Sequence, residues 1–176
     1  MRYIALLRGI NVGGHNKIKM YELRSVFESL GFENVKSYIA SGNVAFDTAK
    51  TTDSALSKKT EKSVKENFSL EIEVMVRTTQ EIENVIKQNP FEKVHDDDQT
   101  KLFVVFLKED LPKEKTDLLV SHNNENEQFE VIGRNIYALS KKGFMKSLLG
   151  KKYIDNKLKT LATARNWKTV NKIANL

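Results

Sequence analysis

The order of strand-like and helix-like patterns in the first 77 residues restricts the fold more than any other feature of this sequence. Short apolar or alternating runs predict strands, and apolar side chains at a period of three to four residues predict helices. Along the chain these patterns predict a strand at 2–10, a helix at 20–30, two strands on either side of Ser41-Gly42, a helix at about 53–68 and a strand at 70–77.

This β-α-β-β-α-β order is typical of the ferredoxin-like unit. A right-handed crossover makes the first two strands parallel and places the third strand between them, antiparallel to both. The loop that leaves the first strand and the hairpin between the second and third strands then lie at the same end of the sheet. We therefore expect residues 8–14 to lie near residues 41–43, although they are far apart in sequence.

The second half of the chain shows a similar plan. Thr78 and Glu81 have capping-box spacing and predict a helix start, and residues 101–108 predict a strand. A helix begun by Pro112 and a hairpin with Gly133-Arg134-Asn135 at its tip follow. We predict an α+β fold with two ferredoxin-like subdomains, residues 1–77 and 78–176, antiparallel sheets and an additional C-terminal helical segment. An internal duplication is consistent with this plan.

The loop "LLRGINVGGHNK" is the first candidate site. Glycine-rich loops point backbone N–H groups into a common concavity that binds anions, and Arg8 and Asn11 lie beside Gly13 and Gly14. The glycine spacing fits neither G-x-G-x-x-G nor the Walker pattern, which excludes a claim for a dinucleotide or P-loop site. The alternative is a tight turn, with Arg8 bonded to a loop carbonyl.

Two further motifs carry the same ambiguity. Ser41, Gly42 and Asn43 are residue types that a tight turn favours, so a turn alone explains this tripeptide. The same residues also offer polar groups to a ligand. In "ATARNWKTV", we predict that a helix begins with Thr163 or Asn166 as its N-cap, which would set a positive helix end beside Arg165. Trp167 is predicted to pack in the core.

Charge and composition exclude several classes of protein. From Arg134 to Leu176 there are 11 basic residues and one acidic residue. This excess of positive charge can attract phosphate-rich partners. The alternative is a lysine-rich surface that only faces solvent. The absence of cysteine excludes disulfides and thiolate metal sites. The N-terminal apolar run is too short for a signal sequence or a membrane span, so we predict a cytoplasmic protein without membrane contact.

The sequence gives no positive evidence for catalysis, a cofactor or a metal. The three histidines lack metal-ligand spacing, and no pair of carboxylates is placed as acid and base. "HDDD" at 95–98 is interpreted as an acidic solvated loop rather than a cation site. Ser41 has no histidine in these motifs to activate it as a nucleophile.

Three stretches together, "ALLRGINVGG", "YIASGNVAF" and "TARNWKTV", resemble the bacterial domain-of-unknown-function family 1697. The resemblance covers nearly the whole chain and implies two ferredoxin-like subdomains and no established activity. His15 departs from the lysine associated with its position. The positions marked by the resemblance are Arg8, Gly9, Asn11, Gly13 and Gly14, then Ser41, Gly42 and Asn43, and finally Thr163, Arg165, Asn166, Trp167 and Thr169.

The leading hypothesis is that a polar pocket binds a small anionic ligand, phosphorylated or nucleotide-like. Arg8, Asn11, Gly13, Gly14, Ser41, Gly42 and Asn43 would form this pocket, and Thr163, Arg165 and Asn166 would close it. An RNA-binding module that uses the basic C-terminal segment is a second hypothesis, not favoured because the strands lack the RNP1 pattern. A third is an interaction or scaffold protein, in which Arg8 and Arg165 bond to protein carbonyls.

Overall fold

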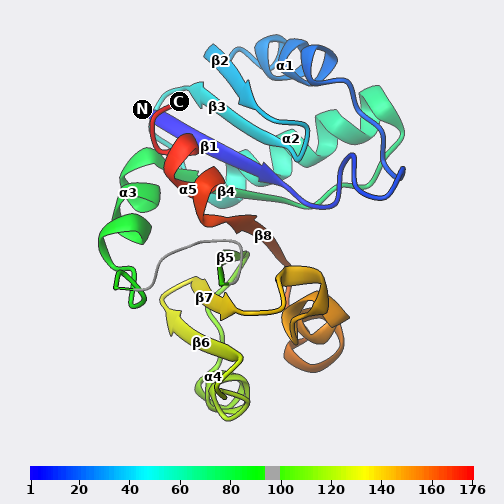
Figure 1. Cartoon of the computed structure of the whole chain (residues 1–176). Helices are drawn as coiled ribbons and strands as arrows, with labels where there is room; N and C mark the ends of the chain where they lie inside the picture. Colours follow the sequence, from blue (N-terminus) through cyan, green and yellow to red (C-terminus); the bar gives the residue numbers. More distant parts are fainter. Residues whose placement is uncertain (94–99) are drawn as a thin grey trace. The chain divides into compact units, whose positions relative to one another are not determined.

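The structure is a computed structural model that describes residues 1–93 and 100–176. Contacts divide the chain into two compact units, Met1–Asn84 together with Lys172–Leu176, and Val85–Asn171. Each unit contains a four-stranded antiparallel sheet with helical elements (Figure 1). The α+β class with two ferredoxin-like subdomains is confirmed. The segment "HDDD" lies outside the described residues.

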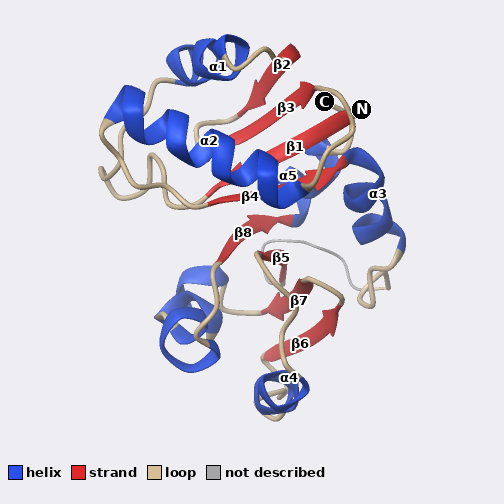
Figure 2. Ribbon diagram, turned by 180° about the vertical axis from the view of Figure 1, so that it is seen from behind, coloured by secondary structure: helices blue, strands red, loops and turns tan. Residues whose placement is uncertain are grey.

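The sheet of the first unit has the strand order β2-β3-β1-β4, so the third strand lies between the first two, as predicted. Helices α1 and α2 cover one face of this sheet (Figure 2). α3 begins in the first unit and ends in the second. The elements are β1 (Arg2–Leu7), α1 (Met20–Ser29), β2 (Glu33–Tyr38), β3 (Asn43–Asp47), α2 (Asp53–Phe68), β4 (Val74–Thr78) and α3 (Thr79–Lys87).

Local sequence signals set the helix ends in this unit. The Thr52 hydroxyl accepts a hydrogen bond from Ala55 N at the start of α2. The capping box at α3 is confirmed: Glu81 N donates to the Thr78 hydroxyl at 3.1 Å, and Thr78 N donates to the Glu81 carboxylate at 2.8 Å. These side chains satisfy N–H groups that a helix start leaves without partners.

Alternate residues of β1 point to opposite faces of the sheet, and both sets are buried. Tyr3, Ala5 and Leu7 join the core beneath α1 and α2, where Phe32 and Phe46 stack with ring centroids 4.3 Å apart. Ile4 and Leu6 belong to the opposite face and are fully buried as well. A continuous apolar run, rather than a polar–apolar alternation, is what such a strand requires.

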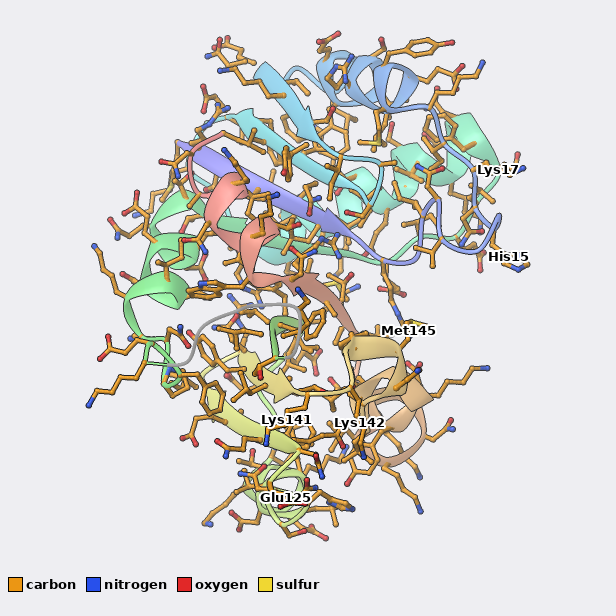
Figure 3. All side chains as sticks on the ribbon, in the orientation of Figure 1. His15, Lys17, Glu125, Lys141, Lys142 and Met145 are labelled. Atoms are coloured by element: carbon orange, nitrogen blue, oxygen red, sulfur yellow. The ribbon has the colours of Figure 1, made fainter. Side chains whose placement is uncertain are left out.

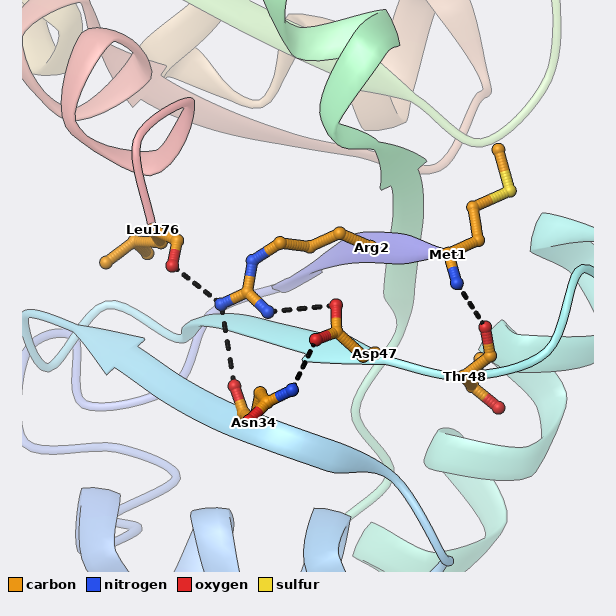
Figure 4. A network of polar contacts seen from close by, with 6 residues as sticks. All are labelled: Met1, Arg2, Asn34, Asp47, Thr48 and Leu176. Atoms are coloured by element: carbon orange, nitrogen blue, oxygen red, sulfur yellow. Dashed lines mark hydrogen bonds and ion pairs between the residues drawn. The ribbon is translucent and has the colours of Figure 1, made fainter.

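A polar network ties the last residue of the chain to the first unit (Figure 4). The Arg2 guanidinium bonds the Asp47 carboxylate at 3.0 Å and the main-chain oxygen of Leu176 at 2.6 Å. Asn34 Nδ2 donates to the other oxygen of Asp47 at 2.7 Å. Strands β1, β2 and β3 and the chain end are therefore linked through one aspartate and one arginine.

The second unit repeats this architecture, with the strand order β6-β7-β5-β8. α5 begins in this unit and ends in the first. No helix among the described residues is long and apolar enough to cross a membrane. The elements are β5 (Lys101–Leu107), α4 (Lys113–Val120), β6 (Glu127–Ile132), β7 (Asn135–Ser140), β8 (Ala162–Asn166) and α5 (Trp167–Ile173).

The prediction that Thr163 caps a helix is wrong. Thr163 lies within β8 and pairs with Phe106 of β5, and α5 begins only at Trp167. Asn166 is the cap, because its side-chain oxygen accepts a hydrogen bond from Thr169 N at 2.8 Å. β8 supplies the second neighbour of β5, so tertiary pairing decides the conformation of a stretch whose own pattern is weak.

The segment between β7 and β8 also differs from the expected helices. It consists of single turns: η1 (Phe144–Lys146) and η2 (Leu149–Lys151) are 3₁₀ turns, and η3 (Ile154–Leu158) is a π turn. Lys152 and Lys159 follow the second and third turns with positive φ values of 60° and 48°, which a continuous α-helix does not allow. These turns occupy the place of the second helix in a ferredoxin-like unit.

Candidate functional site

The opening loop, residues 8–19, folds back on itself as a small hairpin. His15 N donates to Val12 O at 3.0 Å, and Asn11 N donates to Asn16 O at 3.1 Å. Gly13 and Gly14 form the turn with φ values of +58° and +81°. Positive φ at both central positions is the pattern of a type I′ turn, so glycine at these positions has a conformational reason.

The side chain of Asn11 holds this hairpin against the loop between β2 and β3. Its Nδ2 donates to Ile18 O and to Ala40 O, both at 2.9 Å, and its Oδ1 accepts from Ile18 N at 2.9 Å. Both amide hydrogens of Asn11 are therefore used inside the protein. Asn11 positions the loop for any ligand rather than offering it a donor.

The second motif packs closely against the first. Leu7 N donates to Gly42 O at 2.8 Å, and a Cβ on Gly42 would lie 2.8 Å from both Leu7 Cβ and Ile10 Cδ1. Asn43 is fully buried, and its Nδ2 donates to Tyr38 O and to the Ser41 hydroxyl. The structure thus brings residues 7–11 and 40–42 together at one end of the sheet.

The two loops combine cationic side chains with unused backbone donors. Residues 8–19 and 39–43 contain no carboxylate. Arg8 is half-buried at the end of β1, where its backbone N–H donates to Glu73 O at 2.9 Å. His15 and Lys17 are exposed, and their side chains extend from the loop into solvent (Figure 3). Within the described residues, the N–H groups of Gly13 and Gly14 donate to no protein acceptor.

The third motif lies in the second unit. The buried Arg165 guanidinium donates through Nη1 to the Thr163 hydroxyl at 2.7 Å and to Ala164 O at 2.8 Å. Burial lowers the pKa of Arg165 to about 10, so the group stays charged at neutral pH. Asn166 caps α5. Because this motif and the opening loop belong to different units, their joint contribution to one pocket stays a prediction.

Sequence reasoning did not single out Arg77, a second buried arginine. Arg77 pairs with Ile4 in the first sheet as Arg165 pairs with Val104 in the second, and its Nη1 donates to Val76 O at 2.9 Å. It is only 3% exposed. The sequence does carry a signal for this pair of arginines: in both "VRTTQE" and "ARNWKT" an arginine stands one residue before the cap of a helix.

Other parts of the described chain offer weaker candidates. No group of three or more His, Asp or Glu side chains in residues 1–93 and 100–176 is arranged to hold a metal ion. A surface groove of about 420 Å³ lies between α1 and the end of α2, lined by residues that include Tyr21, Ser25 and Phe68. None of the predicted site residues lines this groove.

Comparison with known proteins identifies the family. A family model described as a protein of unknown function, DUF1697, matches residues 1–137. The chain belongs to this family. The DUF1697 match includes the first two motifs and ends before Thr163, Arg165 and Asn166.

A solved structure is similar to this DUF1697 chain over its full length. It is that of the conserved bacterial protein SP0830 from Streptococcus pneumoniae, with a TM-score of 0.78 and 28% sequence identity. The similarity covers 99% of this chain and 97% of that one. No curated protein matches the chain. Fold and family are therefore shown, and the function rests on the residues themselves.

Proposed function

We propose that this DUF1697 protein binds a small anionic ligand, phosphorylated or nucleotide-like, at the opening loop of its first unit. The observation that carries the proposal is the exposed Gly13-Gly14 turn, whose two N–H groups have no protein acceptor in the described chain. Backbone N–H groups of such a turn are favourable donors to phosphate oxygens.

The surrounding residues supply charge and a fixed geometry. Arg8 and Lys17 supply positive charge from the same loop, and residues 8–19 and 39–43 contain no carboxylate. Asn11 and Asn43 hold the two loops through hydrogen bonds to Ala40 O and Tyr38 O, so little ordering is left for the ligand to induce. Gly42 packs against Leu7 and Ile10, and Ser41 accepts a hydrogen bond from Asn43 in the same loop. The proposal is for binding, and it assigns no chemical step.

A thermal-shift titration with inorganic phosphate, a nucleoside monophosphate and a sugar phosphate tests this proposal. A ligand at about 100 times its dissociation constant stabilises the folded state by about 2.7 kcal/mol. We expect a shift in the wild type that is lost in Arg8→Gln and reduced in Lys17→Gln. Lys36→Gln, which removes an exposed charge from β2, is the matched control and keeps the shift.

The variants make the result interpretable. If Arg8→Gln is destabilised, Lys17→Gln still reports on the site, because Lys17 is exposed and its replacement leaves the packing intact. Absence of a shift with all three probes in the wild type contradicts the proposal. An equal loss in Lys17→Gln and Lys36→Gln also contradicts it, because net charge alone would then explain the effect.

A further inference from the structure

The segment between β7 and β8 concentrates positive charge on the second unit. Residues 141–159 contain seven lysines and one aspartate. We call this segment the lysine segment. Its apolar side chains, among them Leu149, Ile154 and Leu158, pack into the core of the second unit. Its exposed lysines are Lys141, Lys142, Lys146, Lys152, Lys157 and Lys159.

Hydrogen bonds hold the backbone of the lysine segment in its middle and near its C-terminal end. Leu148 N donates to the Glu127 carboxylate at 3.1 Å, and Lys115 Nζ donates to Leu158 O at 2.5 Å. Within the segment, the Ser147 hydroxyl donates to Phe144 O at 2.7 Å. The lysines are therefore presented from a held backbone and not from a free tail.

The charges of these lysines are not neutralised by the protein. In the described part of the chain, none of the six exposed lysines makes an ion pair. On α2, by contrast, Lys62 lies 3.8 Å from the Glu66 carboxylate and Lys65 lies 2.7 Å from that of Glu71. The chain thus pairs lysines on one helical surface and leaves them unpaired on another. Unpaired like charges repel one another, which favours an external polyanion.

The polar character of this surface limits the classes of partner that the lysine segment can bind. An amphipathic segment that inserts into a membrane surface, or the centre of a protein interface, needs an exposed apolar face. The apolar residues of the lysine segment face the core, and Met145, 76% exposed, is its one large apolar side chain with high exposure in the described residues (Figure 3). A phosphate backbone requires cations and no such face.

We propose that the lysine segment binds the phosphate backbone of a nucleic acid without reading its sequence. Its aromatic residues are not available for base stacking, because Tyr153 is buried and Phe144 packs on Phe103 with ring centroids 5.1 Å apart. Without stacking platforms, duplexes bind at least as well as single strands, since charge density determines affinity. This site shares no residue with the proposed ligand site.

Fluorescence anisotropy with short labelled DNA duplexes of two unrelated sequences, over a series of salt concentrations, tests the proposal. The wild type should bind both duplexes alike. The triple variant Lys142→Gln, Lys146→Gln and Lys152→Gln should lower the slope of log affinity against log salt by about 2.7, if each lysine neutralises one phosphate. The matched control, Lys36→Gln with Lys50→Gln and Lys58→Gln, removes the same charge from the first unit and should keep the wild-type slope.

Three results would overturn this inference. The first is no duplex binding by the wild type at low salt. The second is an equal fall in slope for both triple variants, which would indicate a net-charge effect. The third is sedimentation with phosphatidylserine vesicles without duplex binding, which would indicate a membrane partner. Arg8→Gln should bind the duplexes like the wild type, so the ligand proposal and this one fail independently.

Discussion

Gly42 is a residue at which both the backbone conformation and the close packing of its neighbours require glycine. Its φ is +80°, and an added Cβ would lie 2.8 Å from the Cβ of Leu7, an atom fixed to the backbone of β1. We expect Gly42→Ala to lower the free energy of unfolding by about 2–4 kcal/mol, because strain at positive φ and overpacking add. Urea denaturation measures this change.

Gly133→Ala is the control for Gly42→Ala. Gly133 occupies the corresponding hairpin of the second unit with a φ of +55°, but nothing lies within 4 Å of its added Cβ. Gly133→Ala should lower the free energy of unfolding by about 1 kcal/mol, because only the strain of positive φ in the backbone contributes. Equal losses for the two variants would show that the close packing of Gly42 against β1 has no energetic weight.

Because of Asp47, part of the free energy of unfolding should depend on pH in the acidic range. The hydrogen bond from Asn34 and, after it, the Arg2 guanidinium lower the pKa of Asp47 below its ordinary value. The unfolded state therefore binds the proton more readily, so the contribution is present at neutral pH and is lost as the pH falls below about 4. We expect the difference in unfolding free energy between wild type and Asp47→Asn to shrink from about pH 6 to about pH 3. A constant difference would contradict this account.

At the residue scale the sequence singled out the polar loop residues, but it did not show which contacts their side chains make. Arg8, Asn11 and the glycine pair were found because polar residues clustered in a loop after a buried strand. One of the two amide hydrogens of Asn11 bonds to Ala40 O, and only the fold of the sheet brings this partner close. A contact across 29 residues has no local signature, so its role could not be read from the loop.

Two tyrosines in the second unit show how one chemical change has opposite consequences in different elements. The hydroxyl of Tyr137, on β7, donates to Val85 O at 2.8 Å, whereas the hydroxyl of Tyr153, between η2 and η3, is buried with no partner in the described structure. Burial raises the pKa of Tyr137 to about 12 and also raises that of Tyr153, so both are protonated donors at neutral pH.

We therefore expect opposite signs from the same substitution. Tyr137→Phe leaves the Val85 carbonyl without its partner and should cost about 1–3 kcal/mol. Tyr153→Phe removes an unsatisfied hydroxyl and should be neutral or stabilising by up to about 1 kcal/mol. Equilibrium unfolding in urea compares the two. A larger loss for Tyr153→Phe than for Tyr137→Phe would mean that the Tyr153 hydroxyl has a partner in solution.

Elements with strong periodicity were predicted from the sequence, and those shaped by neighbours were not. α2, from Asp53 to Phe68, coincides with its predicted range because Thr52 caps its start and its buried residues, among them Leu56, Thr60 and Val64, recur at helical spacing. β8 was taken for a helix start, since five residues with two alanines carry no strand pattern and only pairing with β5 makes them a strand. Residues 144–159 were expected to form helices, but they form single turns, two of which are followed by a residue with positive φ.

The two units share a hydrogen-bonding frame, which supports an internal duplication. Leu7 N donates to Gly42 O as Leu107 N donates to Arg134 O, and Arg8 N donates to Glu73 O as Lys108 N donates to Leu161 O. The loops differ on this frame. The opening loop of the first unit has three glycines and no carboxylate, whereas the corresponding "KEDLP" has two carboxylates and no glycine. The charge of this loop therefore differs between the two units, although the hydrogen bonds that frame it are the same.

The last five residues of the chain belong to the first unit, and their removal should lower the stability of that unit selectively. Lys172–Leu176 cluster with Met1–Asn84, where Ile173 is fully buried and the Leu176 oxygen accepts from Arg2. Truncation after Asn171 removes a buried side chain and a charged hydrogen bond, at a cost of about 2–5 kcal/mol. Ile173→Ala should give much of this loss, and Lys172→Gln, at an exposed position, should give none.

Hydrogen exchange followed peptide by peptide identifies where this loss of stability falls. Amides of β1 and β3 should exchange faster in the truncated chain, because their unit loses part of its core and the Arg2 contact at the end of the sheet. Amides of β5 and β7 should keep their protection, since none of the removed residues belongs to their unit. Faster exchange in both sheets to the same extent would mean that the two units unfold as one cooperative body, and that the division of contacts between them does not extend to their stability.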